Sequence, residues 1–156
     1  MPYQLKQLGP KDLDLMNGLL DCFGQAFDEL DTYGRFRPEA GYLENLLGSD
    51  TFICLAALED QRVIGGLAAY ELRKFEQQRS EIYIYDLAVA ETFRRKGVAT
   101  ALILKLKKIA KTRGAWVVFV QADYEDGPAV SLYTKLGVKE EVLHFDIPLD
   151  REGAGA

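Results

Sequence analysis

The chain has 156 residues, of which 48% are hydrophobic and 28% charged, a composition typical of a soluble globular protein. Its 24 acidic and 19 basic residues give a formal net charge of −5, which disfavours a nucleic-acid partner and suits a cationic ligand. No apolar run approaches the roughly 20 residues that span a bilayer, and the N-terminus has no apolar signal core. We therefore expect a cytoplasmic protein without a membrane partner.

The hydrophobic periodicity predicts, in chain order, strand 3–8, helix 12–27, helix 37–48, strand 51–58, strand 63–72, strand 80–89, helix 98–113, strand 115–120, helix 128–136 and strand 140–147. Gly65 and Gly66 inside one strand indicate a bulge or a close backbone approach. A strand, a crossover helix and another apolar strand imply a parallel pair, whereas the earlier strands form an antiparallel hairpin. The expected fold class is therefore α/β with a mixed sheet, in the order β-α-α-β-β-β-α-β-α-β. We expect one domain over residues 1–148 and a flexible tail at 149–156.

A basic segment between a strand and a helix indicates a phosphate site. Arg94, Arg95 and Lys96 precede Gly97, which opens the helix. Free N–H groups at a helix N-terminus, the positive end of the helix dipole and a glycine that admits an anion to the backbone together favour phosphate binding. From Arg94-x-x-Gly97-x-Ala99 alone, a solubilising surface loop is an equally good interpretation.

Two groups of acids are candidates to receive a cationic substrate. Asp123, Glu125 and Asp126 follow a buried strand, at an edge where ligands of parallel sheets bind. Clustered carboxylates attract a polycation, although a solvated loop with a helix cap is the alternative. Asp28, Glu29 and Asp31 lie near the end of the first helix, where acids oppose the helix dipole. They form either a solvated face or a second patch for a cation.

Three motifs occur in the order Leu87-Ala88-Val89, Arg94-x-x-Gly97-x-Ala99 and Asp126-x-x-Ala129-x-x-x-Tyr133-x-Lys135-x-Gly137. This ordered set resembles the GCN5-related N-acetyltransferase (GNAT) superfamily. The resemblance implies a GNAT fold with a parallel strand pair splayed at an acetyl-CoA site. It implies that the backbone at Leu87, Ala88 and Val89 pairs with the pantetheine arm. It also implies that the pyrophosphate is held by Arg94, Arg95, Gly97, Val98, Ala99 and Thr100.

Three residues depart from the superfamily pattern. Ala99 stands where many members have glycine, and Val138 where an aromatic residue often follows Gly137. Asp126 stands where asparagine is common. The last departure weakens one detail, because an ionised carboxylate cannot donate the hydrogen bond that an amide would.

Longer strings carry a narrower resemblance. The segments FEQQRSEIYIYDLAV (75–89), VQADY (120–124), LYTKLG (132–137) and EVLHFDI (141–147) look like the aminoglycoside 3-N-acetyltransferases of the small GNAT type. This resemblance implies acetylation of the 3-amino group of a 2-deoxystreptamine antibiotic such as gentamicin, with acetyl-CoA as cosubstrate. Antibiotic resistance would be the consequence, and a homodimer is expected at the level of the family.

Asp86 is the first candidate for the base that must take a proton from the substrate ammonium. It lies where its strand approaches the corner that should place the acetyl carbonyl, and the resemblance aligns it with the proposed catalytic acid of the family. Strict alternation puts Asp86 on the face of Ile84 and opposite Tyr85, unless a bulge reverses it. An aspartate that only hydrogen-bonds the strand end is the alternative. Glu81 is a second candidate base, acting through water, and Tyr85 is assigned to substrate binding.

Tyr133 is the candidate general acid for the departing thiolate, with a buried core tyrosine as the alternative. His144, the single histidine, is interpreted as structural because it lies in a late alternating strand. Cys22 and Cys54 have no close spacing and are interpreted as buried thiols, and no metal-ligand spacing is present.

Two other functions stay open at this stage. The same fold could acetylate a polyamine, another small amine or a protein N-terminus. The chain could also bind CoA without turnover, as a sensor or partner protein. Acids on the substrate side favour a cationic small molecule, and the presence of both Asp86 and Tyr133 weakens the inactive alternative.

Overall fold

The computed structural model describes residues 2–150, and the chain divides into two compact units. The first unit is Met1–Gln121 and the second is Ala122–Ala156. The prediction of a single domain over 1–148 with a tail at 149–156 stays a prediction, and residues 151–156 of that tail lie outside the described part.

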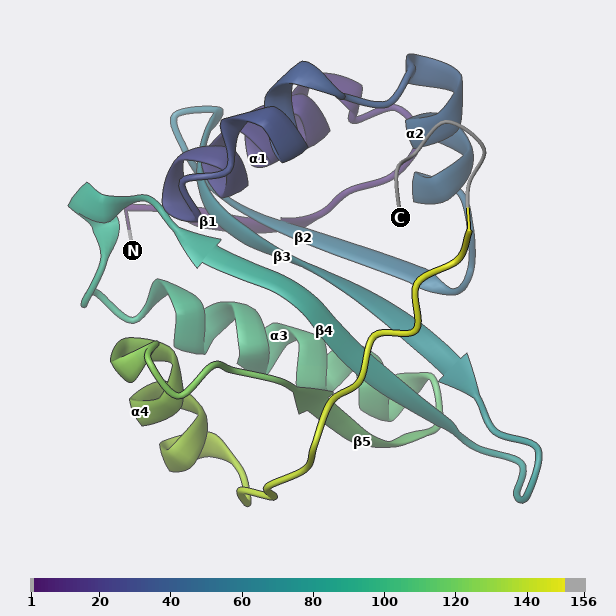
Figure 1. Cartoon of the computed structure of the whole chain (residues 1–156). Coiled ribbons are helices and arrows are strands. Elements are labelled where there is room, and N and C mark those ends of the chain that lie inside the picture. The colour runs from purple at the N-terminus through teal and green to yellow at the C-terminus, as the bar shows by residue number, and fades with distance from the viewer. Residues whose placement is uncertain (1, 151–156) are drawn as a thin grey trace. The chain divides into compact units, whose positions relative to one another are not determined.

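The first unit contains a five-stranded sheet in the spatial order β1-β2-β3-β4-β5 (Figure 1). Its strands are β1 (Gln4–Gln7), β2 (Phe52–Glu59), β3 (Arg62–Arg73), β4 (Ser80–Val89) and β5 (Ala115–Val120). Neighbouring strands are antiparallel except β4 and β5, which are parallel. The predicted mixed sheet with a parallel strand pair is therefore confirmed, but the pair lies at one edge of the sheet and not at its centre, because β5 is the last strand in the described residues.

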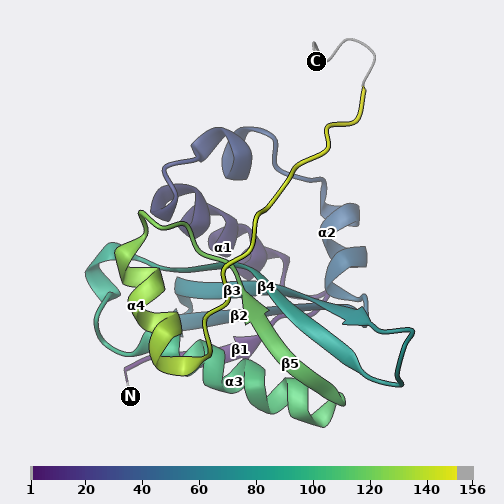
Figure 2. The ribbon, with the colours of Figure 1, turned by 60° about the horizontal axis from the view of Figure 1, so that its bottom comes forward.

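Helices cover both faces of this sheet. One face carries α1 (Leu13–Ala26), a π-helical segment (Asp31–Arg35) and α2 (Ala40–Leu47), whereas α3 (Val98–Thr112) covers the other after a short 3₁₀ turn (Glu91–Phe93). Figures 1 and 2 show α1 and α3 on opposite sides of the strands. Among residues 2–150, no helix is long and apolar enough to cross a membrane.

Apolar stripes on the helices bury against the sheet. On the α1 face, Leu19 and Phe23 pack with Leu43 of α2 and with Cys54 of β2. Leu102, Leu106 and other buried residues form the inner stripe of α3. Each fully buried leucine contributes roughly 1.5–3 kcal/mol. The 3.6-residue spacing that predicted both helices is thus the spacing of the residues that fix them to the sheet.

Gly65 and Gly66 lie where β3 is tightly enclosed by its neighbours. Ala57 pairs with Gly65 but Leu58 pairs with Val63, so β3 carries a bulge directly before the glycines. A Cβ at Gly65 would lie 2.9 Å from the carbonyl oxygen of Ala88 on β4. Both structural interpretations of the glycine pair, the bulge and the close approach, are therefore confirmed.

The second unit contains one helix, α4 (Gly127–Leu136), among its described residues 122–150. Asp126 caps α4, since its Oδ1 accepts a hydrogen bond of 3.2 Å from the Ala129 amide. The predicted strand 140–147 is wrong, because residues 138–150 form neither helix nor strand. A strand needs a partner strand for its backbone groups, and the described part of this unit contains no other strand.

Candidate active site

A bulge in β4 determines where Asp86 points. Ala68 of β3 pairs with Asp86, but the next residue, Ala69, pairs with Ile84, so Tyr85 has no partner of its own. Such a bulge shifts the alternation of side chains by one residue. The expectation from strict alternation, with Asp86 on the face of Ile84, is therefore wrong. Asp86 lies on the α1 face, together with Ala68 of the core cluster on that side.

Asp86 is half-buried and hydrogen-bonded to a tyrosine that sequence reasoning missed. The hydroxyl of Tyr33, in the π-helical segment, lies 3.2 Å from each carboxylate oxygen of Asp86. Burial raises the pKa of Asp86, the hydrogen bond from Tyr33 offsets part of that rise, and the nearby charge of Glu29 adds to it. The pKa of Tyr33 is raised by burial and by the Asp86 charge. Asp86 is thus poised to take a proton more readily than a free aspartate.

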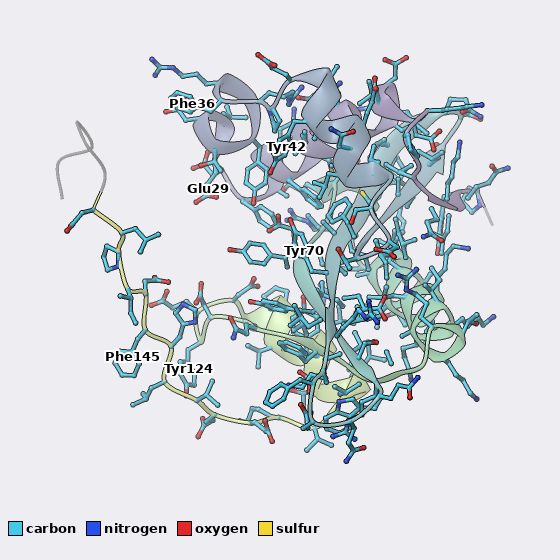
Figure 3. The ribbon with its side chains drawn as sticks, turned by 90° about the vertical axis from the view of Figure 1, so that its right-hand side faces the viewer. Glu29, Phe36, Tyr42, Tyr70, Tyr124 and Phe145 are labelled. Atoms are coloured by element: carbon cyan, nitrogen blue, oxygen red, sulfur yellow. The ribbon has the colours of Figure 1, made fainter. Side chains whose placement is uncertain are left out.

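A cluster of tyrosine rings lies near this carboxylate. The Tyr85 ring meets Tyr70 edge-on with centroids 6.0 Å apart, and Tyr83 at 5.5 Å. Burial raises the pKa of both Tyr70 and Tyr83, and the charges of Tyr85 and Asp86 add to the rise. Figure 3 shows Tyr70, Tyr42 and Glu29 on the same side of the first unit. The aromatic faces and the acids together suit a ligand with ammonium groups.

The other acids named from the sequence lie in different surroundings. Asp31 begins the π-helical segment and is exposed, and the neighbouring Glu29 is the acid whose charge acts on Asp86. Glu81 lies five residues before Asp86 on β4, roughly 16 Å along a strand. Its carboxylate accepts a hydrogen bond of 3.2 Å from the Trp116 indole and lies 4.0 Å from the Lys74 ammonium. These contacts favour Asp86 over Glu81 as the base.

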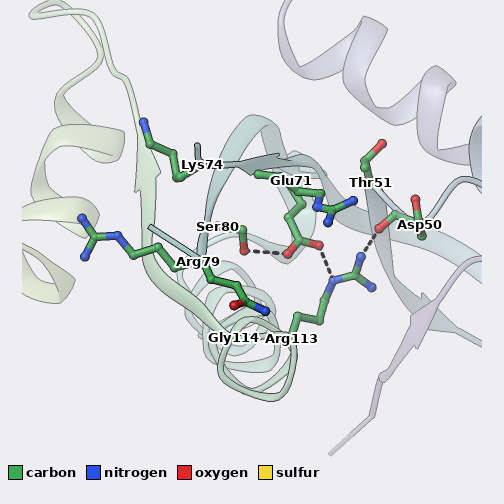
Figure 4. A pocket seen from close by; sticks show the side chains of 10 residues that line it. Asp50, Thr51, Glu71, Lys74, Arg79, Ser80, Arg113 and Gly114 are labelled. Carbon is green, nitrogen blue, oxygen red and sulfur yellow. Dashed lines mark hydrogen bonds and ion pairs between the residues drawn. The ribbon is translucent and has the colours of Figure 1, made fainter. Parts of the chain in front are cut away.

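A pocket of about 470 Å³ lies at the Glu81 end of the sheet (Figure 4). Glu71 crosses it, accepting hydrogen bonds of 2.6 Å from both the Ser80 hydroxyl and the Arg113 guanidinium. Arg113 also donates to the carbonyl of Asp50. Through Glu71 and Arg113, β3 is linked to the start of β4, to the end of α3 and to the segment before β2.

The start of α3 has the features of an anion site. Gly97 is its N-cap residue in the left-handed conformation, with φ of 81°, and no side chain caps the first turn. A Cβ at Gly97 would meet no atom within 4 Å, so the backbone there is open to a ligand. Arg94, Arg95 and Lys96 are all exposed beside it, while Val98 is buried under the helix. These features are compatible with the predicted phosphate site, and phosphate binding at this turn stays a prediction.

The backbone of β4 lacks a strand partner along one edge beside this site. Pairing with β5 ends at Ile84, whereas β4 continues through Leu87 and Ala88 to Val89, which pairs with Gly65 of β3. One edge of residues 85–89 therefore lacks a β5 partner. Arg94 contacts the end of β4, since its Nε donates a hydrogen bond of 2.9 Å to the Val89 carbonyl.

The second unit carries the remaining named residues. Asp123, Glu125 and Asp126 are exposed before α4, and Asp126 is engaged in capping that helix. Tyr133 is half-buried on α4, where burial and then the charge of Asp126 raise its pKa to about 12. His144 is exposed, with Nε2 2.9 Å from Asp146, so the structural role proposed for it in a strand is wrong.

Cys22 and Cys54 are free, buried thiols, as predicted. Within the described range 2–150, no cluster of three or more histidine, cysteine, aspartate or glutamate side chains could hold a metal ion.

Comparison with known proteins identifies the family. The model of the acetyltransferase (GNAT) family matches residues 14–138. The chain belongs to this family. At the level of the family, the predicted acetyl-CoA-dependent N-acetyltransferase is confirmed, as is the GNAT fold.

Aminoglycoside acetyltransferases are among the solved structures that are similar to this GNAT chain. One such enzyme, from an uncultured soil metagenomic sample, is 60% identical with a TM-score of 0.94, covering 96% of this chain and 100% of that chain. Another from an uncultured soil metagenomic sample, solved with sisomicin, is 29% identical with a TM-score of 0.88, covering 96% and 97%.

Two curated GNAT relatives are each 30% identical. The GCN5-related N-acetyltransferase 4, chloroplastic, of Arabidopsis thaliana matches over 122 residues, or 76% of this chain and 37% of the relative. The L-2,4-diaminobutyric acid acetyltransferase of Vibrio cholerae matches over 124 residues, or 69% and 68%. The chain thus spans just over a third of the length of the first of these.

The residues present fit the acetyl-CoA that GNAT enzymes use. The uncapped first turn at Gly97 and the exposed guanidinium of Arg95 suit a pyrophosphate. The free edge of residues 85–89 offers backbone groups to an amide-bearing arm. The predicted assignment of acetyl-CoA to this corner is thus compatible with the geometry.

Proposed function

We propose that this chain acetylates the 3-amino group of a 2-deoxystreptamine aminoglycoside, using acetyl-CoA directly. The observation that carries the proposal is the half-buried Asp86 carboxylate, turned by the bulge into a surface of tyrosines and acids at the end of β4. Its burial and the Glu29 charge raise its pKa toward that of a useful base.

The chain's own groups would supply the proton transfers. A substrate ammonium loses its proton to Asp86, and the free amine nitrogen then bonds to the acetyl carbon as the carbon–sulfur bond breaks. Acetyl-CoA supplies the activated acyl group. Tyr133 is proposed to give its hydroxyl proton to the departing thiolate, and the second proton that the attacking nitrogen loses as the amide forms passes to solvent, from which the Tyr133 hydroxyl is restored. Because thiolates are good leaving groups near neutral pH, Tyr133→Phe should slow turnover without abolishing it.

Charge and aromatic character favour a polycationic sugar as the substrate. In the first unit, Glu29 and Asp31 accompany Asp86, and Tyr85 is 64% exposed. In the second unit, Asp123 and Glu125 are exposed. Carboxylates attract the several ammonium groups of an aminoglycoside, and aromatic faces accept ammonium groups and sugar C–H surfaces. The two solved aminoglycoside acetyltransferases described above support this substrate class.

A smaller amine is the second candidate. The diaminobutyric acid acetyltransferase of Vibrio cholerae, 30% identical, supports it. A substrate that carries its own carboxylate would be repelled by Glu29, so the acids near Asp86 favour the aminoglycoside.

The decisive assay is thiol release from acetyl-CoA with gentamicin, kanamycin, spermidine, 2,4-diaminobutyrate and a peptide as separate acceptors. We expect turnover with the aminoglycosides, and NMR of the product should place the acetyl group on the 3-amino nitrogen. No stimulation by any aminoglycoside would refute the proposal. Stimulation by spermidine or diaminobutyrate alone would establish the second candidate.

Asp86→Asn tests the assigned base. General bases contribute roughly 10²–10⁴-fold, so kcat should fall by about that factor. Because the amide still accepts a hydrogen bond from Tyr33, the fold and the dissociation constant of acetyl-CoA should stay unchanged. Loss of acetyl-CoA binding instead would show that Asp86 has a structural role.

A further inference from the structure

Tyr33 reaches Asp86 from a distant part of the chain. The two residues are 53 positions apart, and the Tyr33 hydroxyl lies 3.2 Å from both Oδ1 and Oδ2. A phenol has one proton, so this position lets it donate to either oxygen of the ionised carboxylate. The tyrosine lies in the π-helical segment Asp31–Arg35, a helix type that is rare and concentrated at functional sites.

Two sets of contacts hold Tyr33 in place. Its ring packs against Phe23 and Phe27, with centroids 5.9 and 5.7 Å away. Its carbonyl accepts hydrogen bonds of 3.3 and 2.8 Å from Nε and Nη2 of Arg37. The same Nη2 lies 2.6 Å from the Asp21 carboxylate on α1. A continuous set of contacts therefore runs from α1 through Arg37 and Tyr33 to Asp86.

We propose that Tyr33 is a positioning residue for the transfer reaction, which orients the Asp86 carboxylate and keeps it ionised until it takes the substrate proton. The proposal rests on the proposed function, because it assigns Asp86 as the base. Arg37 supports it by fixing the backbone from which the Tyr33 side chain extends.

The hydrogen bond from Tyr33 stabilises the ionised form of Asp86 in surroundings that otherwise disfavour it. The titratable groups that face it are Glu29 beside α1, Tyr33, Tyr70 on β3, and Tyr83 and Tyr85 on β4 itself. None of them is a cation. Burial and Glu29 both raise the pKa of Asp86, and Tyr33 is the group among the described residues that lowers it. No group of α3 or β5, which also pack on β4, shifts it.

Removing the hydroxyl isolates its effect. Tyr33→Phe keeps the ring packing against Phe23 and Phe27 and deletes the hydrogen bond alone. The pKa of Asp86 should rise, and because the base acts in its ionised form, the acid limb of the kcat/KM profile should move to higher pH. On that limb kcat/KM should fall about tenfold, as expected for losing a hydrogen bond to a charged group. On the alkaline plateau it should change by less than about threefold.

Two controls separate this role from a general structural one. Tyr3→Phe, beside β1 and outside the surroundings of Asp86, should leave the profile unchanged. In an Asp86→Asn background, Tyr33→Phe should have less than about a twofold further effect, because the two residues act as a unit. An additive loss in the double variant would overturn the proposal.

A direct titration tests the link without turnover. The carboxyl carbon of Asp86, assigned by comparison with Asp86→Asn, can be followed by carbon-13 NMR in the wild type and in Tyr33→Phe. We expect its midpoint at higher pH in the variant. An unchanged midpoint, or an equal loss of activity at every pH, would overturn the role of Tyr33. A wild type that titrates as expected but acetylates no amine would refute the proposed function instead.

Discussion

Replacing Gly66 by alanine should damage the strand that supports the candidate acetyl-CoA corner. Gly66 pairs with Ala88 of β4 on one side and with Ala56 of β2 on the other. An added Cβ would collide with the carbonyl oxygen of Leu55 and lie 2.6 Å from Cδ1 of Leu19. Leu19 is fully buried, so its side chain has little room to move away.

The magnitude follows from which atoms must move. Overpacking a core by one methyl group costs roughly 1–3 kcal/mol when side chains can adjust. Here the nearest atom belongs to the backbone of β2, so we expect about 3 kcal/mol, the upper end of that range. At roughly 2–4 °C per kcal/mol for a protein of this size, the melting temperature should fall by about 6–12 °C.

Urea unfolding followed by circular dichroism measures this change, and Gly41→Ala on α2 is the matched control. A Cβ at Gly41 meets nothing within 4 Å, and alanine in a helix is favoured over glycine by roughly 1 kcal/mol. That control should therefore be neutral or stabilising. A Gly66→Ala protein within about 0.5 kcal/mol of the wild type would refute the argument from close packing.

Two further substitutions test the ionic parts of the first unit. Glu71→Gln removes the charge that faces Arg113 while an amide oxygen can still accept from Ser80, and should destabilise the protein by about 1–2 kcal/mol in urea unfolding. The exposed Glu76→Gln is its control, and an equal effect of the two would contradict the assignment. Arg95→Ala should raise the KM for acetyl-CoA about tenfold with little change in kcat, whereas Lys107→Ala, on the exposed face of α3, should not.

Much of the fold could be predicted because local and tertiary signals agree. The apolar spacing of α3 continues without interruption from Val98 to Ala110, and the same residues are buried. The glycine pair predicted a close backbone approach, and a Cβ at Gly65 or Gly66 would indeed meet backbone atoms of β4 or β2. The turn before α3 was predictable for a similar reason, since Gly97 has a positive φ directly before a helix.

The last strand and Tyr33 could not be predicted from local signals. Residues 140–147 alternate between apolar and polar side chains, as a strand with one buried face would. That pattern does not show whether a neighbouring strand is available for the backbone hydrogen bonds. Tyr33 follows the end of α1 by seven residues, in a π-helical segment with no sequence period of its own. Its role depends on contact with Asp86, which only the tertiary fold creates.

The bulge at Tyr85 explains why the site forms where it does. Before the bulge, Ile82 and Ile84 face α3 and are buried; after it, Asp86 faces α1 and meets Tyr33. Without the extra residue, the period of two would turn the carboxylate into the apolar α3 side, where burial without a hydrogen bond would cost several kcal/mol. The parallel pairing with β5 also stops at Ile84. The proposed reaction requires a base on the substrate face and an unpaired backbone edge for the cosubstrate. Both occur at the same point of β4, where its regular strand pairing is interrupted.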